Sequence, residues 1–397
     1  GGGLGRVVIV SAGVGAGHNG YTRELARRLR ERGYVVDQYD FMDLLPGPTG
    51  SNAVQLYNRT LNHAPWIYAG LFHLGTWSAT ATVTRALLAP ARRRLRALLS
   101  PDVRAVVSTY SLASQLLGPL RRSGQLRVPA ITYVTDFAVH RHWVVPGVDA
   151  LLAPHPVGAM QARVLGAAAN SAIAAGVLVA PGFHPPTPAE REEARRAFGL
   201  PSGRLALVAA GSWGVGRVAQ TAADVAGTGV ATPVVVCGRN ERLREQLDRA
   251  GVPALGWVDD MPTLMRAVDV LVENAGGLMA MEGMATGLPV ATYRPIPGHG
   301  YISAATLEQA GVSTWIRRPS ALRPTLLRLL EGDLGGAQRQ AAAPMLRADP
   351  AEVVARLANP KAFGRLRDRD WSMIDAYRSS RFGTGEPREE RQEEWSR

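Results

Sequence analysis

Residues 276–290 read GGLMAMEGMATGLPV, and this stretch, taken with its flanks, decides the fold. The apolar run 268–272 before it predicts a buried strand, and the glycines of 274–277 predict a tight turn. A helix opens after the turn, and Gly287 ends it where the next predicted strand, 289–292, begins. A strand, a helix and a second strand in this order predict a βαβ unit, and therefore a parallel sheet.

The same alternation of strand and helix signals runs through both halves of the chain. The predicted strands of the first half are 7–10, 35–36, 105–107, 130–134 and 151–152, and those of the second half are 205–210, 233–237, 254–258, 268–272 and 289–292. Four prolines between residues 181 and 188 predict a linker between the halves. We therefore predict an α/β fold of two Rossmann-like domains with parallel sheets facing a cleft, over residues 1–180 and 181–345, followed by a helical tail over 346–397.

Composition narrows the class of protein. The chain has 397 residues, 46% of them hydrophobic, which is enough to bury the cores of two domains. A single cysteine, Cys237 in an apolar run, excludes a disulfide framework and a thiolate metal site, and it predicts a reducing compartment. No apolar run reaches the roughly 18 residues that span a bilayer. We expect a cytoplasmic protein that is soluble or peripheral on the inner face of the plasma membrane.

Positive charge concentrates in the first half of the chain. Residues 1–180 hold 18 Arg against 8 Asp and Glu, so this half carries 18 − 8 = +10 of the net +12. Anionic lipid headgroups and nucleic acid both fit such a charge, but lysine is nearly absent and no nucleic-acid motif is present. We therefore expect no nucleic-acid partner, and an anionic membrane surface stays open.

Residues 50–100 interrupt the alternation with a cluster of aromatics followed by arginines. Arg92, Arg93, Arg94 and Arg96 alternate with leucines. Two interpretations are open. The segment is a membrane or acceptor segment, whose apolar groups enter the acyl boundary while guanidinium groups meet phosphates, or it is a surface helix with a leucine stripe that faces the core.

Three glycine-rich turns follow predicted strands, at 13–17, 211–216 and 274–277. Glycine lets the backbone approach a phosphate closely, and the next helix N-terminus supplies amide donors and positive potential. None of the turns is a Walker loop, and the first has no acidic residue placed for a dinucleotide ribose, which disfavours kinases and dehydrogenases. In the third, Glu282 lies five residues past Gly277 inside the helix, where a carboxylate can accept both hydroxyls of a ribose whose diphosphate sits at the helix start.

Taken in order, these segments resemble the GT-B glycosyltransferases. The nearest resemblance is to diacylglycerol hexosyltransferases, including monogalactosyldiacylglycerol synthases and processive diacylglycerol glucosyltransferases, and to the N-acetylglucosaminyltransferase that makes lipid II. It is carried by 276–290 with PIPGHG (295–300), by GAGH (15–18), by TYVTDF (132–137) with His140 and Trp143, and by VVCGRN (235–240) and GWVDDM (256–261). The resemblance covers roughly residues 6–320.

The resemblance implies a UDP-sugar site in the second half. Diphosphate would lie beside Ser212 and Gly214 and against the turn and helix start, uracil would be read near Val258, and the ribose would be bound by Glu282. His299 stands where the family has a glutamine that contacts the hexose, while Gly300 and Ser303 replace residues that hold sugar hydroxyls. The implied donor-binding residues are Ser212, Gly214, Val258, Gly276, Gly277, Leu278, Met279, Glu282 and His299.

Two residues of the first half compete for the catalytic base. His18 follows a glycine turn at a helix start, which keeps an imidazole neutral and able to accept a proton from a hydroxyl. Asp136 follows an apolar strand and so lies at the sheet edge where open α/β sheets bind ligands. The implied acceptor-binding residues are Gly17, Thr135, His140 and Trp143.

The resemblance implies an inverting glycosyltransferase that moves a hexose from a UDP-sugar to a hydroxyl of a lipid such as diacylglycerol. Backbone amides and helix N-termini would meet the charge of the UDP leaving group, so neither a metal nor a cofactor is expected. Three alternatives remain: a natural-product glycosyltransferase with a soluble acceptor, a nucleotide-sugar epimerase of the same architecture, and a non-catalytic nucleotide-sugar-binding protein.

Overall fold

The computed structural model describes residues 3–13, 16–45, 88–209 and 217–366, and of residues 16–19 it describes the backbone alone. Residues 50–87 of the aromatic and basic segment, Ser212, Gly214 and the end of the tail lie outside the described residues.

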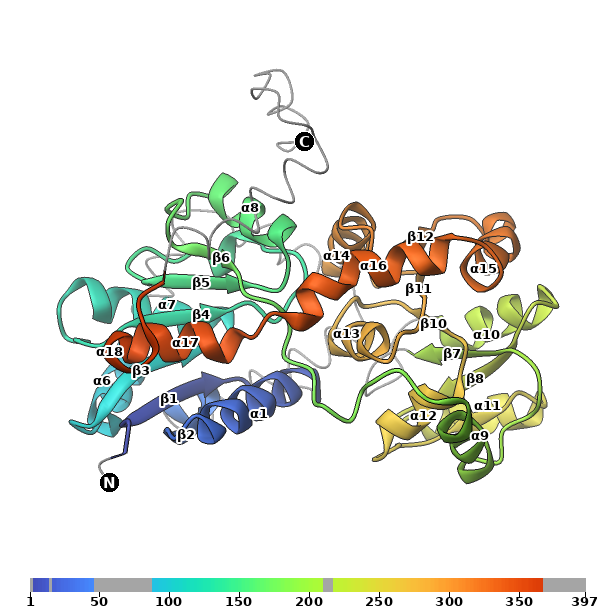
Figure 1. Cartoon of the computed structure of the whole chain (residues 1–397), viewed down its shortest axis with the longest axis horizontal. Helices are drawn as coiled ribbons and strands as arrows, with labels where there is room; N and C mark the ends of the chain where they lie inside the picture. Colours follow the sequence, from blue (N-terminus) through green and yellow to red (C-terminus); the bar gives the residue numbers. More distant parts are fainter. Residues whose placement is uncertain (1–2, 14–15, 46–87, 210–216, 367–397) are drawn as a thin grey trace, which may run out of the picture.

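The first domain is an open parallel sheet covered by helices on both faces (Figure 1). Its six strands lie in the order β2-β1-β3-β4-β5-β6. Their bounds are β1 Arg6–Ser11, β2 Val35–Asp40, β3 Val103–Ser108, β4 Ala130–Tyr133, β5 Ala150–Ala153 and β6 Ala172–Ala174. The connecting helices are α1 Ala16–Glu31, α2 Phe41–Leu44, α6 Ala89–Leu98, α7 Ser111–Arg122 and α8 Pro156–Val164, with a short 3-10 turn, η1, at Arg141–Trp143.

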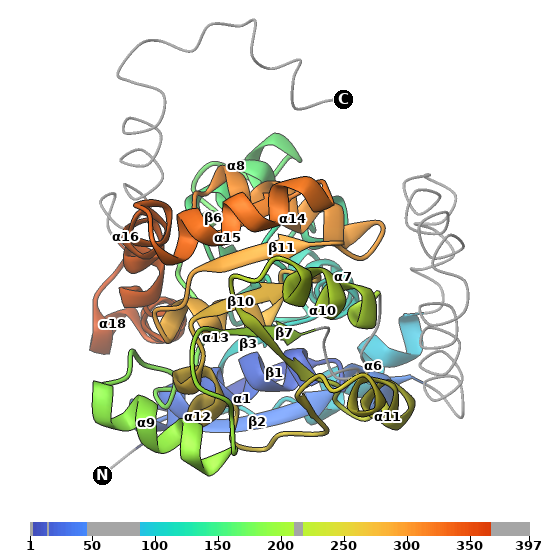
Figure 2. The ribbon, with the colours of Figure 1, turned by 90° about the vertical axis from the view of Figure 1, so that its right-hand side faces the viewer.

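The second domain repeats this architecture. Its six parallel strands lie in the order β12-β11-β10-β7-β8-β9. Their bounds are β7 Leu205–Ala209, β8 Thr232–Val236, β9 Ala254–Leu255, β10 Val270–Glu273, β11 Val290–Tyr293 and β12 Thr314–Ile316. The helices are α9 Pro188–Ala197, α10 Val218–Gly227, α11 Glu241–Arg249, α12 Met261–Ala267, α13 Leu278–Ala285, α14 His299–Gln309, α15 Leu322–Leu330 and α16 Leu334–Arg347. Helices α9 and α12 pack on each other below the sheet (Figure 2).

The chain returns to the first domain at its end. Helix α16 leads into α17, Pro350–Ala358, which lies beside the first sheet and is followed by α18, Pro360–Phe363 (Figure 1). Ala351, Val354 and Ala355 of α17 are fully buried in the core formed by α1 and the first sheet. The hydroxyl of Tyr34 donates to the Ala355 carbonyl at 3.2 Å. Residues 350–363 therefore complete the first domain.

Helix α6 shows where the described leucines of the basic segment point. Leu88 and Leu95 are buried in a core cluster with strands β1 and β3, while Arg93 and Arg96 are exposed. Leu98 is 39% exposed, so over residues 88–100 α6 is a surface helix that buries only part of its leucine stripe in the core. The aromatic part of the segment lies outside the described residues.

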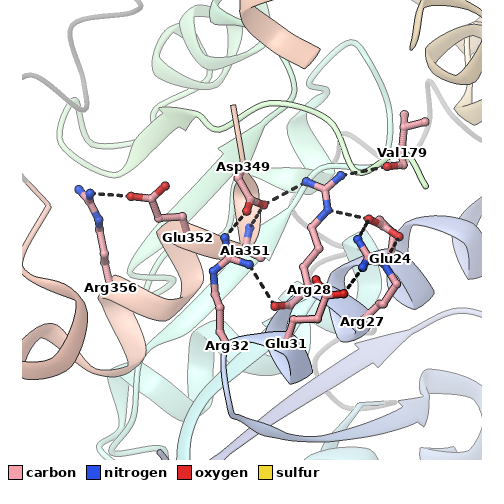
Figure 3. Close-up of polar contacts among 10 residues, drawn as sticks. All are labelled: Glu24, Arg27, Arg28, Glu31, Arg32, Val179, Asp349, Ala351, Glu352 and Arg356. Carbon is pink, nitrogen blue, oxygen red and sulfur yellow. Dashed lines mark hydrogen bonds and ion pairs between the residues drawn. The ribbon is translucent and has the colours of Figure 1, made fainter. Parts of the chain in front are cut away.

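The two chain crossings between the domains meet at Arg28 of α1 (Figure 3). Its guanidinium donates to the Val179 carbonyl of the outgoing crossing at 2.9 Å and to Asp349 of the returning crossing at 3.0 Å. It also binds Glu24, whose side chain is 5% exposed. Arg32 forms a second ion pair with Asp349. One helix of the first domain thus holds both crossings at one place.

We expect Arg28→Ala to lower the free energy of unfolding by about 2–4 kcal/mol, because it leaves the buried carboxylate of Glu24 and the capping carboxylate of Asp349 with fewer partners. Chemical denaturation measures this. The matched control is Arg249→Ala on α11, where an exposed ion pair with Glu245 is lost and the change should stay within about 0.5 kcal/mol. Equal losses for the two variants would contradict a special role of the Arg28 contacts.

Candidate functional site

The second sheet has its reversal of strand order between β7 and β10, which are direct neighbours. Open α/β sheets bind ligands at the carboxyl ends of strands at such a point. The segment after β7, residues 210–216, includes Ser212 and Gly214 and lies outside the described residues. The turn after β10 is 274–277, the third of the glycine-rich turns in the sequence.

The turn after β10 is built so that only glycine fits at position 276. Gly276 has φ of +66°, and a Cβ there would lie 2.9 Å from the Ser303 Cβ and 3.0 Å from a Leu307 methyl on α14. Gly277 has a negative φ and open space around the position of a Cβ. The first glycine is therefore required by the fold, whereas the second leaves room beside the backbone.

Glu273, at the end of β10, fixes the shape of this turn. Its buried carboxylate accepts the amides of Ala275 and Gly276 and the hydroxyl of Thr292. Because these bonds occupy the Gly276 amide, the donors that have no acceptor among the described residues at the helix start are the amides of Gly277, Leu278 and Met279. The amides of a first helical turn have no intrahelical acceptor, and together with the helix dipole they suit a phosphate.

Glu282 lies one turn further along α13 and faces α1 of the other domain. Burial raises the pKa of its carboxyl to about 8, against a small opposing effect of Arg23. Tyr21 of α1 is also near enough for the Glu282 charge to raise the pKa of the phenol, although burial is the larger cause. Among the described residues, no side chain or amide donates to the Glu282 carboxylate. It is a part-buried acceptor to which the described part of the chain offers no donor.

Leu278 shows how closely the domains approach at α13. A Cβ on Gly20 of α1 would lie 2.3 Å from a Leu278 methyl, and the Leu278 side chain packs against the core of the first domain. Its contribution to a diphosphate would therefore come from its backbone amide. Met279 is partly buried against the second core.

Val258 follows β9 in the loop that precedes α12. It is half-buried and packs against the second core. Beside it, Trp257 is 46% exposed, and the Arg239 guanidinium lies 4.8 Å from the centre of its ring. The loop thus offers an exposed aromatic face and backbone groups near the carboxyl edge of β8 and β9.

Across from the second domain, Asp136 follows β4 of the first. One oxygen, Oδ2, accepts from the Trp143 indole at 2.9 Å and from His140 Nε2 at 3.2 Å. Burial alone would raise the pKa of this carboxyl, but the bonds from His140 and Trp143 and the nearby His299 together hold it well below its usual range. Asp136 is therefore ionised across the physiological pH range, and Trp143, itself 2% exposed, supports it from below.

His299 brings the second domain to Asp136. It is the first residue of α14, and it lies near enough to Asp136 to help lower the pKa of that carboxyl. Its Nδ1 atom is buried and has no hydrogen-bond partner among the described residues. Helix α14 also carries Gly300, packed against the Asn274 carbonyl and Ile296, and the buried Ser303. The two candidate residues from opposite halves of the chain thus meet at one place.

The remaining predicted residues lie on the same side of the first sheet. Thr135 is buried next to Asp136. Gly17 and His18 are in the first turn of α1, which follows β1, and their side-chain surroundings lie outside what the structure describes. Within the described ranges no helix could cross a bilayer, and no three side chains of the metal-binding kinds gather together.

Comparison with known proteins agrees with this geometry. Solved structures align with this chain along almost their whole length. The MurG protein of Acinetobacter baumannii aligns at a TM-score of 0.55 and 16% identity, over 89% of this chain and 99% of that one. Medicago truncatula UGT71G1 complexed with UDP-glucose aligns at a TM-score of 0.58 and 14% identity, over 89% of this chain and 98% of that one. The chain has the GT-B fold. The Anabaena protein HepE in complex with UDP-glucose aligns at 0.54 and 13% over 90% and 99%.

The sequence comparisons point to glycolipid enzymes within this GT-B group. The family model for monogalactosyldiacylglycerol synthase matches residues 23–179. The processive diacylglycerol beta-glucosyltransferase of Bacillus pumilus is 24% identical over 83% of this chain and 87% of its own length. The processive diacylglycerol beta-glucosyltransferase of Bacillus mycoides is 25% identical over 87% of this chain and 91% of its own length. The resemblance found in the sequence is confirmed by these matches.

Glu282→Gln should stabilise the ligand-free protein at neutral and alkaline pH. The carboxyl has a pKa of about 8 when folded and near 4.5 when unfolded, so the unfolded state binds fewer protons between these values and the stability of the wild type falls as pH rises through that window. The neutral amide removes this loss. Thermal unfolding at pH 5 and pH 8 measures it: the variant should gain at pH 8 and not at pH 5. A pH-independent difference would contradict the burial of an ionisable group here.

Proposed function

We propose that this protein transfers a hexose from a UDP-sugar to a hydroxyl group of a lipid acceptor such as diacylglycerol, with inversion at the anomeric carbon. The observation that carries the proposal is Glu282, a part-buried carboxyl to which no described residue donates, one turn beyond the helix-start amides of α13 at the switch point of the second sheet. A ribose supplies the two hydroxyl donors that this carboxylate lacks, and a diphosphate suits the amides.

In this proposal the donor binds to the second domain. The diphosphate lies against the amides of Gly277, Leu278 and Met279 and beside Ser212 and Gly214, and the uracil lies against the loop at Val258. The hexose then extends from the helix start towards His299 on α14. Amides and helix dipoles meet the charge that develops on the leaving UDP, so that no metal ion is needed.

The first domain supplies the acceptor side of the proposed reaction. A carboxylate whose pKa lies far below neutrality is a weak general base, so we assign the acceptance of the hydroxyl proton to His18 at the start of α1. Asp136 stays ionised, faces the hexose contact His299, and stabilises the positive charge that builds up on the sugar ring as the bond to UDP breaks. Thr135, His140, Trp143 and Gly17 shape the acceptor site.

The lipid acceptor is supported by the sequence relatives. The matching family model and the Bacillus relatives are named for diacylglycerol glycosylation. The first half of the chain carries most of the positive charge, and α6 exposes Arg93 and Arg96, which suits a protein that approaches anionic headgroups. We propose that it works in the cytoplasm at the inner face of the plasma membrane.

Isothermal calorimetry with UDP tests the donor site. Glu282→Ala should weaken UDP binding by about 1.5–3 kcal/mol, because a charge-assisted hydrogen bond is lost. Wild-type affinity should rise with pH up to about 8, because the ionised carboxylate is the form that accepts both ribose hydroxyls. Gly277→Ala should spare stability and weaken binding, since its methyl group lies where a phosphate would approach. Absence of any heat with saturating UDP would end the proposal.

Release of UDP from UDP-hexoses, with and without diacylglycerol in anionic vesicles, tests the reaction. We expect diacylglycerol to stimulate release, EDTA to leave the rate unchanged, and mass spectrometry to find the glycosylated lipid with inverted configuration. His18→Ala should reduce turnover strongly and keep UDP affinity. Stimulation by a soluble hydroxyl acceptor alone would favour natural-product glycosylation, formation of an epimeric UDP-sugar would favour an epimerase, and UDP binding without turnover would favour a binding protein.

A further inference from the structure

Gln161, near the end of α8, lies between the loop that carries Asp136 and the helix that carries His299. Its Oε1 accepts the amide of Val139 at 2.9 Å, within the first domain. Its Nε2 donates to the Thr306 hydroxyl at 3.2 Å, across the domain boundary. The hydroxyl of Thr306, a residue that is 3% exposed, in turn donates a hydrogen bond to the Ile302 carbonyl at 2.8 Å. One side chain therefore joins the two domains by a directed chain of hydrogen bonds.

The chemistry of these groups fixes the orientation of the Gln161 amide. The Val139 amide can only donate, so the atom facing it must be the oxygen. The Thr306 hydroxyl donates its single hydrogen to the Ile302 carbonyl, so it must accept from Gln161. The Gln161 atom that faces it must therefore be the nitrogen. A side chain that lacks either group cannot complete both contacts.

The same face of α8 also fits the backbone of the Asp136 loop. Gly158 lies one turn before Gln161, and a Cβ there would be 3.3 Å from the Phe137 carbonyl and 3.3 Å from a Val139 methyl. The loop therefore rests against α8 at Gly158 and is bonded to it at Gln161. Val139 directly precedes His140, which contacts Asp136.

The other end of the chain of bonds leads to the second domain's part of the site. Ile302 and Thr306 lie on α14 one and two turns after His299. Because α14 begins at His299, a shift of the helix relative to α8 moves His299 relative to Asp136. The bond between Gln161 and Thr306 exists only while the two domains are together.

We propose that Gln161 is a positioning residue that couples domain closure to the alignment of Asp136 with His299, and so sets the turnover number rather than donor affinity. The inference rests on the proposed function, because that function places Asp136 and His299 on opposite sides of the transferred hexose. In the open state Gln161 keeps its bond to Val139 and loses Thr306. On closure, the bond to Thr306 sets the depth to which α14 approaches the acceptor loop.

A double-mutant cycle with Gln161→Met and Thr306→Val tests the coupling. Both substitutions keep side-chain size and remove hydrogen bonding. Each should lower kcat about 3- to 10-fold and change the UDP dissociation constant by less than twofold, and the double variant should be no slower than the slower single variant, because both break the same contact. Gln246→Met on the exposed face of α11 is the matched control and should keep wild-type kcat.

Hydrogen exchange separates the cross-domain contact from local support of the loop. Gln161→Met should speed exchange of the Val139 amide, while Thr306→Val should leave that amide protected and still lower kcat. The inference is overturned if Thr306→Val keeps wild-type kcat, or if the two losses multiply in the double variant. If the wild type binds UDP and turns over, and the variants keep the wild-type kcat, this inference alone is refuted. If the wild type shows no UDP binding or no turnover, the proposed function is overturned and this inference with it.

Discussion

The contact on which the rest of this structure depends is the one between the Arg28 guanidinium and the two chain crossings. A guanidinium carries five donors in a planar fork, and here it binds the Glu24 carboxylate, the Val179 carbonyl and the Asp349 carboxylate. The crossings also touch each other, since the Val177 amide donates to the Met345 carbonyl at 3.3 Å. Two polypeptide strands held at one point act as a hinge: they limit translation of one domain past the other and leave rotation about that point. The contacts at α1 with α13 and at α8 with α14 are compatible only with a narrow range of such rotation.

That constraint explains why residues of opposite halves can form one site. Asp136 and His299 are separated by most of the second domain in sequence, and neither is held by the other's domain. Gly20, at the boundary, admits the Leu278 side chain of the other domain, and Gly158, within the first domain, admits the loop that follows Asp136. A larger side chain at Gly20 would hold the domains apart, and one at Gly158 would displace the loop that follows Asp136. The boundary therefore combines a hinge that fixes position with a glycine that permits close contact.

Much of the fold could be predicted from the sequence, because each long strand is an apolar run bounded by a turn. The strands that were not predicted are β6 and β12 at the outer edges of the sheets, because AIA and TWI are too short to show a periodicity. The return of α17 to the first domain could not be inferred either, because its buried face consists of small residues such as Ala351 and Ala355 that pack on β-strands more than 200 residues away. In the site, Glu282 and the glycine turn were found because they are close in sequence. Gln161 was missed because its partners lie 22 and 145 residues away, and a half-buried glutamine has no pattern that identifies it.

The burial of Glu282 connects the hinge to the chemistry. Glu282 faces α1, and burial disfavours its ionised form in the closed, ligand-free protein, which raises the pKa of the carboxyl to about 8. A ligand that brings hydroxyl donors to this carboxylate relieves that cost in the closed arrangement, where the surroundings are driest, and less in an open one, where water already solvates the group. Such a ligand therefore binds the closed arrangement more tightly than the open one and shifts the population towards closure. In that closed arrangement α14 lies against α8, where the contact between Gln161 and Thr306 determines how Asp136 and His299 align.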